Sequence, residues 1–192
     1  MMIGRIGMHA AAVVCAVATS ATAAEVLPFT LSSPAFKDGA VLPLEYAGGK
    51  QCGAASKGGD ISPPLAWAHA PAGTKSFAIV MIDPDGRRGL GSVHWVAYGI
   101  APSHTGVKAG EGGSAAPAKD IVEGKNSRGS VGYIGPCGPP QDAPHHYVIG
   151  VLALDLAPDA LPAGLDRDAL FKAISGHSLG PASLVVRYRR EE

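Results

Sequence analysis

The stretch MIDPDGRRGLGSVHWVAY, residues 81–98, decides how the rest of the sequence is interpreted. It joins two apolar runs through a polar, glycine-rich connection. If these runs are neighbouring strands, the connection is the tip of a hairpin-like link. Asp83, Asp85 and His94 then return to the same end of one sheet. Polar side chains gathered at the end of a sheet predict a functional site there.

The runs on both sides have the composition of buried strands. Residues 75–82 contain the continuous apolar run FAIVMI, which is typical of a strand covered on both faces. Residues 93–100 and 146–154 predict two further long strands in the same way. Residues 26–32 and 41–46 predict short strands near the beginning of the chain.

Other segments predict a sandwich with one small helix. The segment SPPLAW, residues 62–67, predicts an extended edge segment, because proline cannot donate to a β-ladder. Asp166 is a typical helix cap, and residues 182–190 predict a final strand. Between them, apolar residues recur at helical spacing: Ala169, Leu170, Ala173 and Ile174. The sequence therefore predicts a mainly β fold, a β-sandwich with a short helix in the C-terminal region.

The composition agrees with one such domain and excludes some functions. The 192 residues include 26 Gly and 16 Pro, and 17% are charged, which favours many turns and few long helices. The 46% apolar content is too high for a disordered chain. The formal net charge is zero and no cluster of Lys and Arg forms a basic patch, so nucleic-acid binding is not expected.

The beginning of the chain has the pattern of a secretory signal peptide. Arg5 supplies a positive start, residues 10–18 are apolar, and ATAAEV offers small residues for cleavage near residue 24. A membrane anchor is the alternative, but a span needs about 20 apolar residues. We therefore expect a signal at residues 1–24, a domain at residues 25–192, and a periplasmic or secreted protein with no integral membrane segment after processing.

Two cysteines, Cys52 and Cys137, remain once the signal is removed. Exported proteins with two cysteines often pair them, so we expect one disulfide. Closing so long a loop would stabilise the fold by about 4 kcal/mol in the chain-entropy estimate. Two unpaired buried thiols are the alternative.

Strand geometry indicates which polar side chains can meet. Residues two apart share a face of a strand. Asp83 and Asp85 therefore lie side by side if their segment is extended. By the same rule His145 and Tyr147 share a face, and His146 lies on the other.

His94 is expected on the face of Val96 and Tyr98, at the mouth of an apolar surface. The segment GYIGPCGPP, residues 132–140, places glycines where the backbone can approach a ligand and leave N–H groups free for an anion. Each feature also has an ordinary structural interpretation, since DPDG alone is a common turn and a single histidine at a strand end is often a boundary residue. Their combination at strand ends in one domain favours a site.

The ordered segments resemble the phosphatidylethanolamine-binding protein family, specifically its bacterial Raf-kinase-inhibitor-like branch. The likeness runs from Phe29 to Arg190. It is carried by SPPLAW, PAGTKSFAIVMIDPD, HWVAYGI, GYIGPCGPP and PHHYVIGVLALD, in this order. The resemblance implies a sandwich with a large central antiparallel-rich sheet, a second smaller sheet and a pocket for phosphate-like anions. The residues that match the family pocket are Asp83, Asp85, His94, Gly135, Cys137, His145 and Tyr147.

Two positions and one segment depart from the family pattern. Position 146 is His where the family usually has Arg, and Gly138 looks like an extra residue before the two prolines. The segment KNSRGSVG, residues 125–132, matches the usual acidic-aromatic-glycine pattern only loosely. These departures leave the electrostatics and the loop geometry beside the pocket open.

The expected function is binding of phosphate or a phospholipid head group in the cell envelope. Aspartates in an anion site require either a proton on the phosphate or a zwitterionic ligand whose ammonium meets a carboxylate. Histidines would donate better when protonated, so binding should tighten as pH falls through about 6.5. Neither a cofactor nor a metal is predicted, because HExxH and His-x-His spacings are absent.

Two other functions stay open. The Asp/His cluster could serve a phosphoester hydrolase or a metal-dependent enzyme. The family resemblance also implies regulation or inhibition of a protein partner, a kinase or a protease, with residues 101–144 as the expected contact region.

Overall fold

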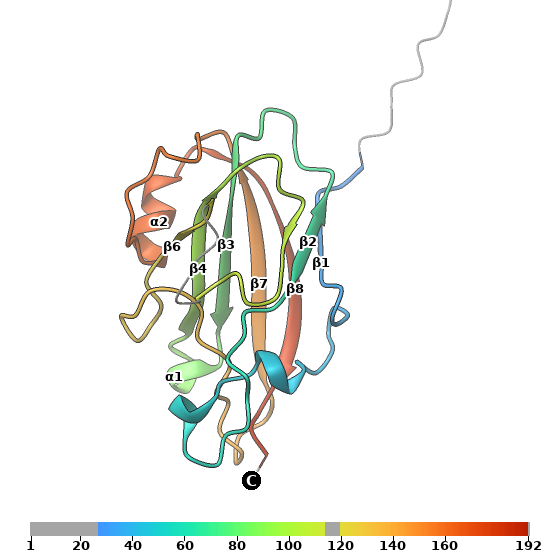
Figure 1. The fold of residues 1–192 in the computed structure, drawn as a ribbon, viewed down its shortest axis with the longest axis vertical. Helices are drawn as coiled ribbons and strands as arrows, with labels where there is room; N and C mark the ends of the chain where they lie inside the picture. Colours follow the sequence, from blue (N-terminus) through green and yellow to red (C-terminus); the bar gives the residue numbers. More distant parts are fainter. Residues whose placement is uncertain (1–26, 114–119, 192) are drawn as a thin grey trace, which may run out of the picture.

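The computed structural model describes residues 27–113 and 120–191 (Figure 1). The predicted signal peptide and its cleavage site lie outside the described residues. The chain forms two antiparallel sheets packed face to face, so the predicted mainly β sandwich is confirmed. None of the helices within the described residues is long and apolar enough to cross a membrane.

The larger sheet has the strand order β6-β4-β3-β7-β8. Its members are β6 (Val122–Glu123), β4 (Ser92–Ile100), β3 (Ser76–Asp83), β7 (His145–Leu154) and β8 (Ser178–Tyr188). The three long apolar runs of the sequence became its central strands, because only strands covered on both faces can bury side chains continuously. β3 and β4 are antiparallel neighbours, so the predicted hairpin-like connection is also confirmed.

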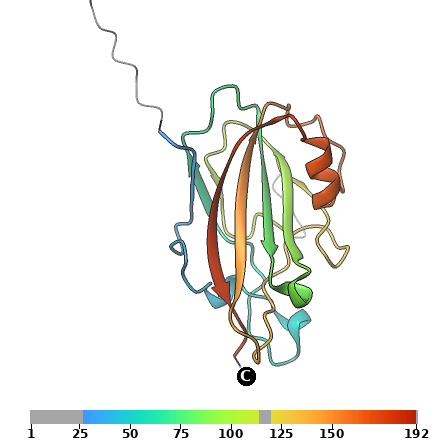
Figure 2. The ribbon, with the colours of Figure 1, turned by 180° about the vertical axis from the view of Figure 1, so that it is seen from behind.

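The smaller sheet has the order β1-β2-β5 and covers one face of the larger one (Figures 1 and 2). Its strands are β1 (Thr30–Ser32), β2 (Leu65–Ala68) and β5 (Gly106–Val107). The main core fills the space between the sheets, where Trp67 of β2 packs against Phe77 of β3 at 5.1 Å between ring centroids.

The helices are short. α2 (Arg167–Ala173) covers the opposite face of the larger sheet and buries Leu170 over a second apolar cluster. The predicted cap is confirmed, since the Asp166 carboxylate accepts a hydrogen bond from the Ala169 amide at 2.8 Å. The remaining helical turns are η1 (Leu44–Tyr46), η2 (Lys50–Cys52) and α1 (Gly86–Gly89).

Two predictions about strands were wrong, and both concern segments that contain proline. Residues 41–46 do not form a strand: Val41 makes one isolated bridge to Arg187, and Pro43 precedes the 3₁₀ turn η1. SPPLAW does not supply an edge strand. Its prolines end before β2, which starts at Leu65 and pairs with β1 on one side and β5 on the other.

A β-bulge at the start of β4 redirects His94. Ile82 pairs with Val93 and Met81 pairs with Trp95, so His94 is an extra residue between two pairs. Its ring packs edge-on against Tyr147, which belongs to the core between the sheets, at 5.2 Å between centroids. The predicted sharing of a face with Val96 and Tyr98 was therefore wrong, because the bulge breaks the two-residue period.

Candidate functional site

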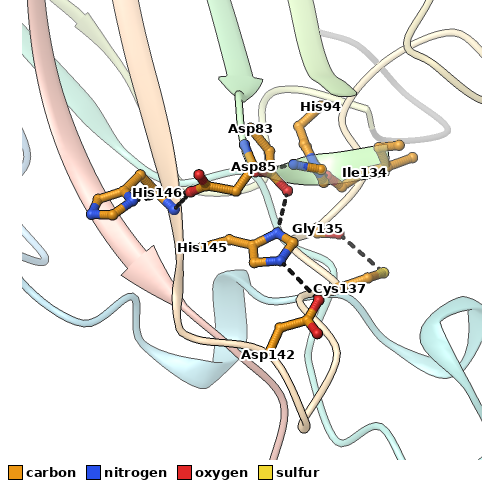
Figure 3. A network of polar contacts seen from close by, with 10 residues as sticks. Asp83, Asp85, His94, Ile134, Gly135, Cys137, Asp142, His145 and His146 are labelled. Atoms are coloured by element: carbon orange, nitrogen blue, oxygen red, sulfur yellow. Dashed lines mark hydrogen bonds and ion pairs between the residues drawn. The ribbon is translucent and has the colours of Figure 1, made fainter. Parts of the chain in front are cut away.

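Asp83 ends β3 and is the most completely bonded carboxylate of the site. It is 4% exposed. Its Oδ1 accepts hydrogen bonds from the amides of Asp85 at 3.0 Å and Gly86 at 2.9 Å, and its Oδ2 accepts one from His145 Nδ1 at 2.9 Å (Figure 3). The aspartate thus fixes both the turn after β3 and the orientation of the imidazole on β7.

Asp85 does not lie beside Asp83 as a second carboxylate facing the same way. Its backbone is in the right-handed helical region, because the turn held by Asp83 begins there. Its Oδ2 accepts hydrogen bonds from the backbone amide and Nδ1 of His146, at 2.8 and 3.0 Å. The backbone bond, followed by the side-chain bond, lowers the pKa of Asp85. The histidine at position 146 thereby holds Asp85 at the rim of the site.

His145 lies between two carboxylates. Its Nδ1 donates to Asp83, and its Nε2 donates to Asp142 over a longer distance of 3.4 Å. Burial alone would lower the pKa of His145, but the hydrogen bond and charge of Asp83, with smaller effects from Asp142 and Asp85, outweigh burial and raise it. Because both nitrogens face acceptors, the arrangement favours the imidazolium form.

His94 has the opposite character. Its Nδ1 lies 2.8 Å from the carbonyl oxygen of Ile134, which can only accept, so Nδ1 carries the proton and Nε2 carries a lone pair. Burial lowers the pKa of His94, and the bond to Ile134 and the charge of Asp83 oppose this only in part. The site therefore combines a charged donor, His145, with a neutral histidine that can accept.

Tyr147 shares a face with His145, as predicted, and their rings stack at 6.4 Å between centroids. The tyrosine is fully buried behind the site, and its hydroxyl has no hydrogen-bond partner of good geometry within the described residues. Burial, and then the charge of Asp83, raises the pKa of Tyr147 far above its ordinary value. Tyr147 supports the two histidines and holds an unsatisfied donor beneath them.

The loop 132–140 is anchored by a disulfide between Cys52 and Cys137, as expected, with a Cα–Cα distance of 5.4 Å. Its amides are less free than the sequence suggested. The amide of Gly135 donates to Asp60 Oδ1 at 2.7 Å, so it is not available to an anion. Cys137 reaches the site, and Gly135 serves to hold the loop.

These groups surround one cavity of about 600 Å³. Of the residues selected from the sequence, the cavity is lined by Asp83, Asp85, His94, Cys137 and His145. Gly135 and Tyr147 do not line it. The residues that sequence reasoning missed are Arg87, Arg88, Arg128 and Asp142. The first two lie in the quoted connection, and Arg128 occupies the segment that departs from the family pattern.

The arginines change the electrostatics of the site. Arg87, Arg88 and Arg128 form no ion pair with any residue that the structure describes, whereas Asp83, Asp85 and Asp142 each face a histidine. Arg128 Nη2 also donates to Cys137 Sγ at 3.3 Å, which places its charge at the disulfide edge of the cavity. The cavity therefore offers uncompensated positive charge at its rim.

Two further arrangements bear on chemistry. Within the part of the chain that the structure describes, no three His, Cys, Asp or Glu side chains are grouped as metal ligands would be. GHSLG, residues 176–180, has the G-x-S-x-G spacing of a serine nucleophile elbow. That elbow joins a strand to a following helix. Here Ser178 follows α2 and opens β8, at the end of the sheet opposite Asp83.

The fold and the cavity define a two-sheet β-sandwich with a histidine-lined, arginine-rimmed cavity at one end of its larger sheet. Residues 32–189 match the sequence profile of the phosphatidylethanolamine-binding protein family. The chain belongs to that family, in the branch that contains YbcL and the UPF0098 proteins, as the resemblance implied.

Relatives agree in sequence and in structure. The chain is 38% identical to a candidate lipoprotein of Mycobacterium tuberculosis, LppC, over 87% of this chain and 74% of LppC. It is 34% identical to a UPF0098 protein of Methanothermobacter thermautotrophicus, over 83% of this chain and 98% of that protein. The crystal structure of Escherichia coli YbcL superposes with a TM-score of 0.74 at 30% identity, covering 85% of this chain and 99% of YbcL.

Proposed function

We propose that the cavity binds a phosphate-bearing anion, either free phosphate or the phosphate of a lipid head group. One observation carries the proposal. Within the described part of the chain, the imidazolium Nε2 of His145 is held by a single 3.4 Å contact to Asp142, a carboxylate whose side chain is 48% exposed on a loop. A stronger anion can take the place of that carboxylate, and Arg128 on the cavity rim adds a second cation.

The two histidines suit a phosphate that carries one proton or one ester group. His145 donates to an anionic oxygen, whereas the lone pair on His94 Nε2 can accept from a P–OH group. A zwitterionic head group would use the same cavity differently, with its ammonium near the displaced Asp142. Asp83 and Asp85 repel an anion in the cavity less than free carboxylates would, because each already contacts a histidine. This holds for both kinds of ligand.

Calorimetry with inorganic phosphate tests the proposal. We expect Arg128→Gln to weaken binding by about tenfold, because it removes a charge-assisted contact. The matched control is Lys75→Gln, which removes an exposed cation at the opposite end of β3 and should leave binding unchanged. Equal loss in both variants, or no binding to the unmodified protein, would contradict the proposal. Turnover of a phosphate ester that requires His94 would favour the hydrolase instead.

A substitution of Asp142 should change phosphate affinity in the opposite direction. Asp142→Asn should tighten phosphate binding by about fivefold, since it removes a carboxylate that competes for His145 and repels the ligand. Titrating phosphate into both proteins at one pH and ionic strength measures the difference. Weaker binding by Asp142→Asn would mean that the loop carboxylate helps to hold the ligand, for example through a protonated phosphate.

We further propose that the protein works outside the cytoplasm as a regulator of a partner protein. The disulfide and the similarity to a candidate lipoprotein support export. Inhibition of a kinase or protease rests on analogy with the family. Mass spectrometry of the intact protein from the cell envelope tests export: loss of residues 1–24 is expected, and an intact, reduced chain would contradict it.

A further inference from the structure

A second cavity, of about 460 Å³, lies next to the anion cavity. The two cavities share three lining residues, Arg87, Ser92 and Ser127. All three lie at the beginning of β4 or in the loops beside it. The two cavities are therefore neighbours, and a ligand larger than phosphate would reach the second cavity by crossing these three residues.

The loop that joins β3 to β4 lines both cavities, and its backbone is costly to form. Arg87 and Arg88 are consecutive non-glycine residues with φ of 52° and 61°, in the left-handed region. Gly86 precedes them, where an added Cβ would lie 2.8 Å from Ser92 Oγ and 2.9 Å from Asp83 Oδ2. The tight packing of Gly86 thus ties this strained loop to the anion site and presents Arg87 to both cavities.

The second cavity differs from the first in its apolar side chains. Ile82 and Val93, a cross-strand pair, line it and are only partly buried. Leu90, at its rim, is 81% exposed, the highest value among the large apolar side chains that the structure describes. A ligand in this cavity would cover the apolar surface that these three side chains still expose.

The charges around the second cavity do not favour binding of a second anion. Asp168 pairs with Arg167 at 3.4 Å, and Asp166 caps α2 through its Oδ1. Lys125 and Arg87 supply cations on the same wall, so acidic and basic groups are nearly balanced. The apolar side chains therefore distinguish this cavity from the anion cavity.

We propose that the ligand is an organic phosphate ester whose phosphate binds in the anion cavity and whose apolar substituent lies in the second cavity, against Ile82, Leu90 and Val93. This inference rests on the proposed anion binding and narrows the ligand class. It accounts for the apolar side chains in a cavity that borders the anion cavity.

Three probes and two variants test it by calorimetry on the disulfide-bonded protein. The probes are inorganic phosphate, glycerol phosphate with a polar substituent, and phenyl phosphate with an apolar one. We expect phenyl phosphate to bind about tenfold more tightly than the other two, from the apolar area it buries. Leu90→Ser should remove most of that preference and leave inorganic phosphate unaffected. Leu179→Ser, at the far end of the sheet and 38% exposed before substitution, is the control.

The outcomes separate the two proposals. Equal affinity for phenyl phosphate and inorganic phosphate, or a preference that survives Leu90→Ser, would overturn the second-cavity assignment and leave the anion site standing. Tighter binding of glycerol phosphate would assign the second cavity to a polar substituent and also overturn it. No binding of any probe would overturn both proposals.

Discussion

Replacing Asp83 by alanine is expected to lower the free energy of unfolding by about 3 kcal/mol, whereas Asp85→Ala should lower it by about 1 kcal/mol or less. Asp83 is buried and accepts three hydrogen bonds, two from the turn and one from His145. Its removal leaves His145 without the nearer of its two carboxylate partners, at a buried position. Among the residues that the structure describes, the Asp85 carboxylate accepts hydrogen bonds from His146 alone, at an exposed site.

Urea unfolding of the two variants and the unmodified protein measures the contrast. The pair is well matched, because both changes remove one carboxylate from the same Asp-Pro-Asp segment. Equal destabilisation by the two variants would contradict the assignment of Asp83 as the carboxylate that organises the site. A larger loss in Asp85→Ala would mean that the rim contact to His146 holds the connection in place.

Removing the disulfide should have the largest effect on stability. The double variant Cys52→Ser and Cys137→Ser is expected to lose about 4 kcal/mol, because the bond closes a loop with a sequence separation of 85 residues. The loop that carries Cys137 also forms a wall of the cavity, so phosphate affinity should fall with stability.

Thermal unfolding with and without reductant checks this prediction. The unmodified protein should lose stability on reduction, and the double variant should not respond. A free-thiol assay on unreduced, unfolded protein should find no titratable thiol at Cys52 or Cys137. Two free thiols there, or equal stability of the double variant, would contradict the bond.

The sequence predicted the parts of the fold that follow from regular patterns. Continuous apolar runs identified β3, β4 and β7, and the cap at Asp166 identified α2. The predicted faces of His145 and Tyr147 were right because β7 pairs without interruption at that end. These features are local, so the residues within each segment determine them.

The site was less predictable where it depends on interruptions or distant contacts. The bulge that turns His94 toward Tyr147 leaves no mark in the hydrophobic pattern. The amide of Gly135 is taken by Asp60, a residue 75 positions away. Arg128 reaches the cavity only because its loop packs beside Cys137. Such contacts arise from the tertiary fold, and no local pattern contains them.

The pH dependence of the site follows from the raised pKa of His145. Its pKa in the folded protein lies above the ordinary value of 6.5. The stabilisation from its imidazolium is fully present below pH 6.5 and is lost as pH rises through the raised pKa. Anion binding through His145 should decline over the same range, above the pH expected from an ordinary histidine.

The most direct test follows the histidine ring signals of ¹⁵N-labelled protein by NMR while inorganic phosphate is added, from about pH 5.5 to 8. We predict that phosphate shifts the Nε2 signal of His145 and raises its pKa further, while His94 keeps its proton on Nδ1. If about 10 mM phosphate leaves the His145 ring signals and pKa unchanged, the proposed anion site is wrong.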